Sequence, residues 1–524
     1  MMLCHKYPPP QDYFLYIFAR CVPEDHYLLQ LRKIIDFERF RPLLNPSYSL
    51  GEGRPPFDPV FMLKLDLLGY HYGLSDRELM KQLPVNMAFR LFLDWGAERK
   101  VPHHTSMTYF RNRIGEEALK DIFHGVLGQA REMGLVKDRL RLKDATHVLA
   151  NIAVPSTIRL VAETRDRLLE ATDPFAPAYV KEQWDHALQI TKRTEDLADV
   201  ERLLQRVDHL RSLVQWADEF TKGAMFRDAA AADQENLRTA LELAHKVLAD
   251  REDAKAGDKV LSTQDPDARC GKHGGFYDGY MLDVTTDADS QLITGINVLP
   301  ANGNEGQDAA HLIQEEEKAH GNDVEAISID GAGYNGEVLR ELTNPEGLNM
   351  EVFTPPTTRI PLTVFGPEEF KLSEDRKTLT CPAGQTTTHH ERNGNDTGEK
   401  FRFSKKQCSG CTMREKCLAT PTTRSRSVIK NDYEAEYKAA QAKAQTAEYA
   451  KVRKEHPAIE RKLSELVNRH GMRHARYRGI SKVRRQALAT GMVVNLKRIV
   501  KLRTQVAAGV KRTEIVRAEL VKQG

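Results

Sequence analysis

The sequence predicts a mixed α/β protein with a helical N-terminal region, and two kinds of pattern support this prediction. Short segments of alternating or near-continuous apolar residues, typical of strands, occur near residues 140–149, 276–300 and 324–330. Apolar residues at steps of three and four, typical of amphipathic helices, recur before residue 135 and between residues 158 and 260. The length of 524 residues is enough for about three or four domains.

The region up to about residue 135 is predicted to consist of short helices. Phe61, Leu65 and Leu68 recur at four- and three-residue steps, and Ser75 with Glu78 forms a candidate capping box at the start of the next helix. Short helices joined by tight turns are typical of helix-turn-helix modules that bind DNA. A plain helical packing domain has the same periodicity, so this alternative stays open.

A further helix is predicted to begin at Thr105 or Ser106, with Arg111 and Arg113 exposed near its end. Basic side chains on such a helix could contact DNA. Arg111 and Arg113 are therefore candidate DNA-binding residues.

Residues 158–260 are predicted to form a helical hairpin inserted after the first strand of the sheet. Val200, Leu203, Val207 and Leu210 line one stripe with charged residues between them. The stretch shows no catalytic pattern, so we expect a structural role. DNA clamping and dimer contacts are the alternatives.

From residue 275 onwards, the predicted elements follow the order of an RNase H-like fold. Residues 275–287 and 291–301 are predicted to form a β-hairpin, followed by a helix at 308–321 and a strand that ends at Asp330. A helix at 336–344 and a strand at 350–355 follow. Together with the strand that carries Asp144, this order would set Asp144 and Asp330 on adjacent central strands.

Three carboxylates, Asp144, Asp330 and Glu460, form the candidate catalytic site. The two aspartates lie in or at the end of predicted strands, and Glu460 lies near the start of an amphipathic helix. Mg²⁺ prefers carboxylate oxygens, and two such ions about 3.5–4 Å apart support phosphoryl transfer on nucleic acid. Two alternatives remain. An Asp followed by Gly, as at Asp330, is often a turn former, and Glu455 and Glu465 lie on the same or neighbouring turns as Glu460.

Four segments around these residues resemble, in the same order, the DDE transposases of bacterial insertion sequences. Residues 54–83 (RPPFDPVFMLKLDLLGYHYGLSDRELMKQL) resemble the N-terminal domain of that family. DATHVLANIA, from Asp144, resembles the first catalytic strand, and GAGYN, after Asp330, resembles the second. IERKLSELVNRHGMRHARYRG, from Ile459 to Gly479, resembles the third catalytic block. One such segment would be a weak signal, whereas four in order are a strong one.

The resemblance implies a transposase that cleaves DNA at the ends of its element and joins the 3′-hydroxyls to target DNA. Asp144, Asp330 and Glu460 would be the ligands of Mg²⁺ or Mn²⁺. The implied partners are double-stranded DNA, both as terminal inverted repeats and as target, and further copies of the chain in a homo-oligomer on DNA. The alternatives are an RNase H-like nuclease that does not join strands and a catalytically inactive DNA-binding protein.

The segment 358–426 is poor in large apolar residues and contains a cluster of cysteines. The four members are Cys381, Cys408, Cys411 and Cys417. A C-x2-C pair with two further cysteines suits a tetrahedral structural zinc ion, which replaces a hydrophobic core in a short segment. His389 or His390 could take the place of one cysteine, and four reduced thiols without metal are the alternative.

The formal net charge of +3 hides a strongly basic C-terminal part. From Lys451 to the end, the chain has about twenty Lys and Arg and about five acidic residues. Such a segment attracts DNA because neutralised phosphates release counterions. Arg473, Arg476 and Arg478 are the candidate phosphate contacts, and a solvated helical surface is the alternative.

No segment approaches the roughly 20 apolar residues that cross a bilayer. The N-terminus also lacks the basic-then-apolar order of a signal peptide. We therefore expect no membrane contact and a cytoplasmic location.

The predicted organisation has six parts: a helical N-terminal DNA-binding domain (1–135), the first part of an RNase H-like catalytic domain (136–157), a helical insertion (158–260), the continued RNase H-like core (261–357), a Cys-rich insertion (358–426), and a catalytic helix with a basic helical C-terminal region (427–524).

Overall fold

The computed structural model describes most of the chain: residues 13–48, 56–96, 99–252, 258–272, 274–304, 306–357, 364–395, 397–418, 420 and 422–522. Arg54 and Thr358, the first residues of two predicted segments, lie outside these ranges. Within them, no helix combines the length and the apolar character needed to span a membrane.

The N-terminal region is helical, as predicted. Its α-helices are α1 (Tyr13–Cys21), α2 (Tyr27–Ile34), α3 (Arg41–Leu44), α4 (Pro59–Tyr72), α5 (Asp76–Gln82), α6 (Met87–Phe92), α7 (Thr105–Ile114) and α8 (Glu117–Glu132). The carboxylate of Asp58 caps α4 by accepting hydrogen bonds from the N–H groups of Val60 and Phe61, at 2.9 and 3.0 Å. The predicted capping box of Ser75 and Glu78 at the start of α5 is confirmed.

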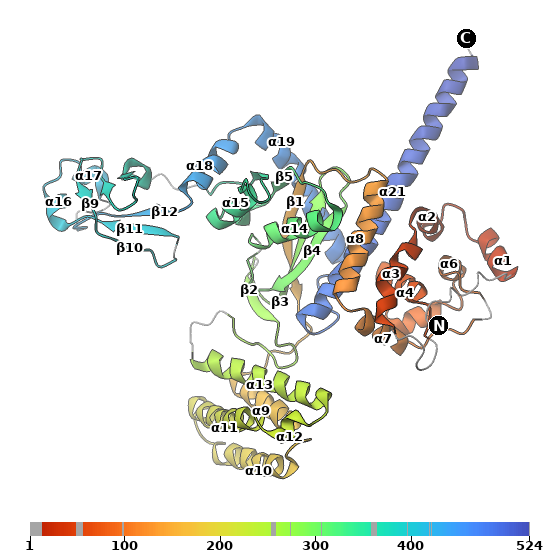
Figure 1. Ribbon diagram of the computed structural model, residues 1–524, viewed down its shortest axis with the longest axis horizontal. Helices are drawn as coiled ribbons and strands as arrows, with labels where there is room; N and C mark the ends of the chain where they lie inside the picture. The colour runs from red at the N-terminus through yellow and green to blue at the C-terminus, as the bar shows by residue number, and fades with distance from the viewer. Residues whose placement is uncertain are drawn as a thin grey trace.

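One six-stranded sheet forms the centre of the chain (Figure 1). Its strands are β1 (Arg141–Leu149), β2 (Arg269–Lys272), β3 (Phe276–Asp287), β4 (Ile293–Pro300), β5 (Ala326–Ser328) and β6 (Glu351–Phe353). β3 pairs antiparallel with β1, β2 and β4, whereas β5 pairs parallel with β1 and β6 pairs parallel with β5. The predicted hairpin of β3 and β4 and the order of the later strands are therefore confirmed.

The helices that follow β4 and β5 were also predicted. They are α14 (Asp308–His320) and α15 (Gly336–Thr343). Gly321, with φ 65°, ends α14 in the left-handed conformation that glycine adopts without a steric penalty. Ala309, Ala310 and Ile313 of α14 share a buried cluster with residues of α15 and β5.

The inserted segment differs from the predicted helical hairpin. It contains the long helices α9 (Thr157–Thr172), α10 (Pro177–Arg193), α11 (Asp199–Phe220) and α13 (Ala231–Glu252), with the short α12 (Ala224–Arg227) between the last two. Figure 1 shows them as a bundle below the sheet. Leu210, Leu237 and Ala244 are fully buried in a core that belongs to the bundle alone. A single hairpin would leave part of these apolar faces in water, and two further helices cover them.

The Cys-rich segment contains two three-stranded sheets. Their strands are β7 (Lys371–Leu372), β8 (Leu379–Thr380), β9 (Thr386–Thr387), β10 (His390–Arg392), β11 (Gly398–Arg402) and β12 (Ser427–Asn431). Two short helices, α16 (Lys405–Ser409) and α17 (Arg414–Cys417), follow β11. Cys408 lies in α16, Cys417 ends α17, and Cys411 lies between the two helices. The segment has a small core of Phe370, Leu379, Phe401, Phe403 and Val428.

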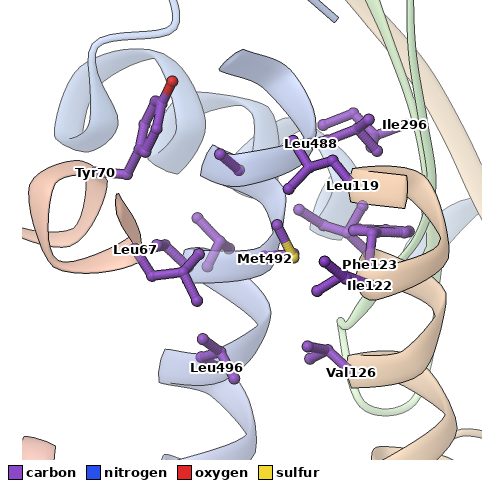
Figure 2. Packing of buried hydrophobic residues seen from close by; sticks show 14 of the residues in the cluster. Leu67, Tyr70, Leu119, Ile122, Phe123, Val126, Ile296, Leu488, Met492 and Leu496 are labelled. Atoms are coloured by element: carbon purple, nitrogen blue, oxygen red, sulfur yellow. The ribbon is translucent and has the colours of Figure 1, made fainter. Parts of the chain in front are cut away.

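The C-terminal part is helical and ends in one long helix. It consists of α18 (Glu434–Lys443), α19 (Ala447–Glu455), α20 (Pro457–Ser464), a π-helical turn (Glu465–Arg469) and α21 (Ile480–Lys522). Figure 2 shows Leu488, Met492 and Leu496 of α21 between side chains of α4 and α8. Ile296 of β4 lies beside them. Helix α21 therefore joins the N-terminal helices and the sheet in one core.

Different helices cover the two faces of the sheet. A Cβ atom at Gly295 of β4 would lie 3.2 Å from Cδ2 of Leu312 in α14. A Cβ atom at Gly491 of α21 would lie 3.2 Å from Cδ1 of Ile296, the next residue of β4. Because neighbouring residues of a strand point to opposite faces, α14 and α21 lie on opposite sides.

Candidate active site

Asp144 lies in the middle of β1 on the face that α21 covers. It is paired with Val284 of β3, which in turn is paired with Ile296 of β4. Side chains of directly paired residues point to the same face of a sheet. Helix α20 also packs against β1 and β3. The Asp144 side chain is partly exposed, and its Oδ1 accepts a hydrogen bond of 2.8 Å from the N–H of Ala145.

Asp330 follows β5 and reaches the same level as Asp144. The parallel register pairs Leu142 of β1 with Ser328 of β5. Asp144 and Asp330 each lie two residues further along, so the continued register places them side by side. The strands β1 and β5 are adjacent, as predicted, but Asp330 lies two residues beyond the end of β5 and not on the strand.

Asp330 also forms a turn, as the alternative interpretation predicted. Its Oδ1 accepts a hydrogen bond of 2.9 Å from the N–H of Ala332 and caps the 3₁₀ turn Gly331–Gly333. Its carbonyl accepts a hydrogen bond of 2.7 Å from the hydroxyl of Thr354, just after β6. These contacts fix the backbone at Asp330, and the carboxylate remains partly exposed.

Arg453 of α19 and His456, which precedes α20, attach this helical region to the end of β5, and neither is among the predicted site residues. Nη1 of Arg453 donates hydrogen bonds to the carbonyl of Ile329, at 2.9 Å, and to Oγ of Ser328, at 3.2 Å. Nδ1 of the buried His456 lies 3.0 Å from the same Oγ. Burial lowers the pKa of His456 to about 4 and Arg453 adds to this, whereas Asp330 opposes it.

Glu460 lies on the same side of the helix as His456, one turn later, because residues four apart are neighbours on a helix surface. Its side chain is exposed, while the preceding Ile459 is fully buried. The contact of His456 with Ser328 places the start of α20 beside the strand that precedes Asp330. His456 precedes the IER segment by only three residues, which is the signal that could have identified it.

The two competing glutamates are engaged elsewhere. Oε2 of Glu455 lies 2.7 Å from Nη2 of Arg139, and Oε2 of Glu465 lies 2.9 Å from Nζ of Lys462. For Glu460, no ion pair is found within the described part of the chain. Of the three, Glu460 is therefore the most available to a cation.

A cavity of about 270 Å³ lies near β1, and neither Asp144 nor Asp330 is among its described lining residues. Ala145, which follows Asp144, and Ala332, which follows the Asp330–Gly331 pair, both line it. Lys272 and His147 also line it, and a Lys ammonium is suited to a phosphate oxygen. The residues described contain no group of three or more His, Cys, Asp or Glu that is arranged to hold a metal ion. Asp144, Asp330 and Glu460 therefore do not form a metal-holding group in this conformation, although their carboxylate oxygens are the donors that Mg²⁺ prefers.

A buried charged group lies on the opposite face of β1. Nζ of Lys143 lies 2.7 Å from Oδ1 of Asp283, and both side chains are almost completely buried. Burial raises the pKa of Asp283 to about 7, with a further contribution from Asp308, while Lys143 opposes the rise. Neither Lys143 nor Asp283 is among the predicted site residues, although a Lys within an apolar strand is an unusual residue that signals such a group.

The prediction that Arg111 is exposed on α7 is wrong. Its guanidinium lies 2.7 Å from carboxylate oxygens of both Asp66 and Asp76, and its side chain is only 9% exposed. These two carboxylates hold it inside the N-terminal core, so it is not available to DNA in this structure. Arg113 is exposed, and its guanidinium stacks over the ring of Tyr48 at 4.5 Å.

The three C-terminal arginines differ in their surroundings. Arg473 is partly buried, and its Nη1 donates a hydrogen bond of 2.5 Å to the carbonyl of His147 in β1. Arg476 and Arg478 are exposed. The guanidinium of Arg476 lies 5.0 Å from the ring centre of Tyr70, and Nε of Arg478 donates to the carbonyl of Asn151 at 3.0 Å. Backbone hydrogen bonds between Leu149 and residues 473–475 place this segment beside the end of β1.

The four clustered cysteines line one small cavity between the two sheets of their segment. In this conformation, these four described cysteines do not form a group that could hold a metal ion. Cys21 and Cys270 are exposed and lie apart from the cluster. Cys4 lies outside the described residues.

Two family models match the chain. The model described as Transposase domain (DUF772) matches residues 17–113, which include α1 to α7. The model described as Transposase DDE domain matches residues 380–500, which include the four cysteines, Glu460 and the three C-terminal arginines. No solved structure matches the chain. With a transposase domain at its N-terminus and a DDE domain toward its C-terminus, the chain belongs to the DDE transposases of insertion sequences.

Proposed function

We propose that this transposase cleaves DNA at the ends of its insertion sequence and joins the freed 3′-hydroxyls to target DNA by two-metal phosphoryl transfer. Asp144, Asp330 and Glu460 are the proposed metal ligands. The observation that supports the proposal is the parallel register of β1 and β5, which pairs Leu142 with Ser328, each two residues before one of the two aspartates.

We propose an RNase H-like fold for the catalytic part. Three antiparallel strands, β1, β3 and β4, stand on one side of the sheet, and β5 and β6 continue it in parallel on the other side of β1. Helices α14 and α15 lie between the later strands in the chain, as this fold requires. The four-helix insertion separates β1 from β3 in sequence and leaves their pairing intact.

The chemistry divides between bound cations and the protein. When bound, Mg²⁺ or Mn²⁺ activates the attacking oxygen and stabilises the leaving oxygen of an in-line displacement. The carboxylates of Asp144, Asp330 and Glu460 hold the cations and balance their charge. Arg453 and His456 keep α20 against the end of β5, so that Glu460 stays near the two aspartates.

The exposed cationic groups have a separate role in this proposal. Arg476 and Arg478 follow α20, the helix that carries Glu460, and bind DNA phosphates without regard to base sequence. Arg113 contributes to recognition of the element's ends from the N-terminal helices. Arg473 acts mainly by holding its segment against β1, because its guanidinium is bonded to the β1 carbonyl.

The test is a reaction of the purified full-length chain with duplexes that carry the element's terminal repeats and a supercoiled target plasmid. We expect strand cleavage and 3′-end joining that require Mg²⁺ or Mn²⁺ and stop when EDTA is added. Cleavage without joining would indicate a nuclease. Specific binding without cleavage would indicate an inactive DNA-binding protein, and either result would contradict the proposal.

A further inference from the structure

The Cys-rich segment holds four thiols around one cavity, and two backbone structures position them. Cys381 directly follows β8, at the start of a tight turn. The N–H of Gly384, with φ 79°, donates to the carbonyl of Cys381 at 2.9 Å, and the N–H of Cys381 donates to the carbonyl of Gln385 at 2.8 Å. Because only glycine adopts this backbone conformation without a penalty, the Cys-Pro-Ala-Gly sequence supports the turn.

The other three cysteines lie on or between α16 and α17. Cys408 is in α16, Cys411 follows that helix, and Cys417 is the last residue of α17. Nε2 of Gln407 donates a hydrogen bond of 2.7 Å to the carbonyl of Thr386 in β9. This bond attaches α16 to the strand after the Cys381 turn, so the two structures face each other across the cavity.

Among the described residues, thiols and cationic groups line the cavity, and no carboxylate does. Its volume of about 20 Å³ is enough for one small ion, since a single water needs about 10–15 Å³ by the same kind of measure. All four cysteines line this one cavity together with Arg414 and Arg426.

One cationic side chain at the cavity has an unused donor. Nε of Arg426 is buried and has no hydrogen-bond partner among the described residues, although its Nη2 donates to the carbonyl of Phe365 at 2.6 Å. Arg414 also lines the cavity, and its Nη1 donates to the carbonyl of Cys408 at 3.0 Å. A buried unpaired N–H is costly. A thiolate next to Arg426 would accept that hydrogen bond and be stabilised by the charge.

We propose that Cys381, Cys408, Cys411 and Cys417 bind one zinc ion as thiolates in a closed, structural site. Binding converts four thiols to thiolates and releases four protons, which leaves a net charge of −2 on the zinc and its ligands. Arg414 and Arg426 offset this charge. The sulfur atoms are not yet gathered around a metal position in this conformation, so the side chains of the two facing structures converge when the ion binds.

The proposed ion stabilises a segment with a limited apolar core. Five buried side chains hold two sheets whose strands are two to five residues long. A core this small contributes little free energy, and small modules commonly need a metal or disulfide. The site is chemically distinct from the carboxylate site, because soft thiolates select zinc and leave no open coordination position for a phosphate.

The experiment measures metal content in the full-length chain, purified under reducing conditions without added metal. We expect about one zinc per chain, the stoichiometry of a four-thiolate site. The double variant Cys408→Ser, Cys411→Ser should lose it. The control variant Cys21→Ser, Cys270→Ser changes two exposed cysteines outside the cluster and should keep it.

A second measurement covers the case in which the cluster variant does not fold. Stepwise modification of the wild-type thiols with a mercurial reagent, followed by a colorimetric zinc indicator, should release zinc as the partly buried thiols of the cluster react. The proposal is overturned if the wild-type chain retains no zinc after incubation with Zn²⁺ and gel filtration. It is also overturned if the double variant keeps its full zinc content, or if zinc leaves before any thiol of the cluster reacts.

Discussion

Glu455, Glu460 and Glu465 lie on successive turns of the same helical region, and their partners distinguish them. Glu455 and Glu465 neutralise Arg139 and Lys462, so binding a cation there would first break an ion pair. Glu460 is exposed one turn after His456, which contacts the end of β5. Three glutamates that lie close together in the sequence thus have different roles, because different side chains surround each of them in the folded chain.

The proposed catalytic residues are tested by changes that keep their shape. Asp144→Asn, Asp330→Asn and Glu460→Gln should each lower the cleavage rate by roughly a thousand-fold, because metal stabilisation of the transition state is worth several kcal/mol. DNA binding in an electrophoretic shift assay should change little. Glu455→Gln and Glu465→Gln are the matched controls and should cleave nearly as well as the wild type. Loss of cleavage in a control, with activity retained in Glu460→Gln, would transfer the catalytic role to that glutamate.

Arg111 and Arg113 are two residues apart on α7, and we expect them to affect different properties. Arg111→Ala leaves the buried carboxylate of Asp66 without its partner, which should cost about 3–5 kcal/mol of unfolding free energy. Arg113→Ala should change stability by less than about 0.5 kcal/mol, as for most surface substitutions. It should weaken binding to the element's ends. Urea unfolding and DNA-binding titrations measure the two effects, and a stable Arg111→Ala chain that binds DNA poorly would contradict the assignment.

At the scale of secondary-structure elements, β1 combines two kinds of chemistry on its opposite faces. Asp144 points toward the side of α20 and α21, while Lys143 points toward Asp283 and α14. The alternation of a strand separates these neighbouring residues by the thickness of the sheet. A buried ion pair of this kind is weak evidence for stability, because desolvation offsets much of the attraction.

The buried Asp283 predicts a pH dependence of stability. Its pKa is raised from 3.8 to about 7, mainly by burial. Between these values the folded chain binds a proton that the unfolded chain has lost, so the unfolding free energy falls as pH rises through this window. Urea unfolding at several pH values should show this fall in the wild type and a smaller one in Asp283→Asn. Asp289→Asn, an exposed change in the same hairpin, is the control and should keep the wild-type slope. Equal slopes in all three proteins would exclude Asp283 as the group responsible.

At the scale of the whole molecule, the first part of α21 joins the N-terminal helices to the sheet. Its buried side chains pack between α4, α8 and β4 (Figure 2), so the basic C-terminal part lies against both the N-terminal helices and the sheet. The helical bundle and the Cys-rich segment extend from this body in different directions (Figure 1). The contact of Arg476 with Tyr70 of α4 joins the basic C-terminal part to the N-terminal helices.

This distribution of charge predicts how DNA affinity responds to salt. The double variant Arg476→Ala, Arg478→Ala should bind specific and unrelated DNA less tightly. The slope of log affinity against log salt should flatten by about one unit per lost phosphate contact. Fluorescence anisotropy across a salt series measures both effects. Arg402→Ala removes an arginine that is already paired with Glu391 and should leave the slope unchanged. A loss restricted to the element's own ends would show that these arginines read sequence.

The sequence by itself determined the element order, the helical N-terminal region, the capping box at Ser75 and the segments that resemble a transposase. These features depend on local periodicity and on interactions between residues a few positions apart. Both can be read from the sequence without knowledge of the fold. It also predicted that the strand with Asp144 lies next to the strand that precedes Asp330, because the order of elements restricts the topologies available to a sheet.

Only the tertiary structure decided the features that depend on contacts between distant residues. Arg111 is buried because Asp66 and Asp76 reach it from two other helices, and the insertion is a bundle because α9 and α13 cover the hairpin of α10 and α11. The parallel pairing of β1 with β5 likewise joins strands that are far apart in the chain. The same is true of the hydrogen bonds of Arg453 and His456 to the end of β5. Periodicity shows which face of a helix or strand is buried, but the partner that buries it is set by the packing of the whole chain.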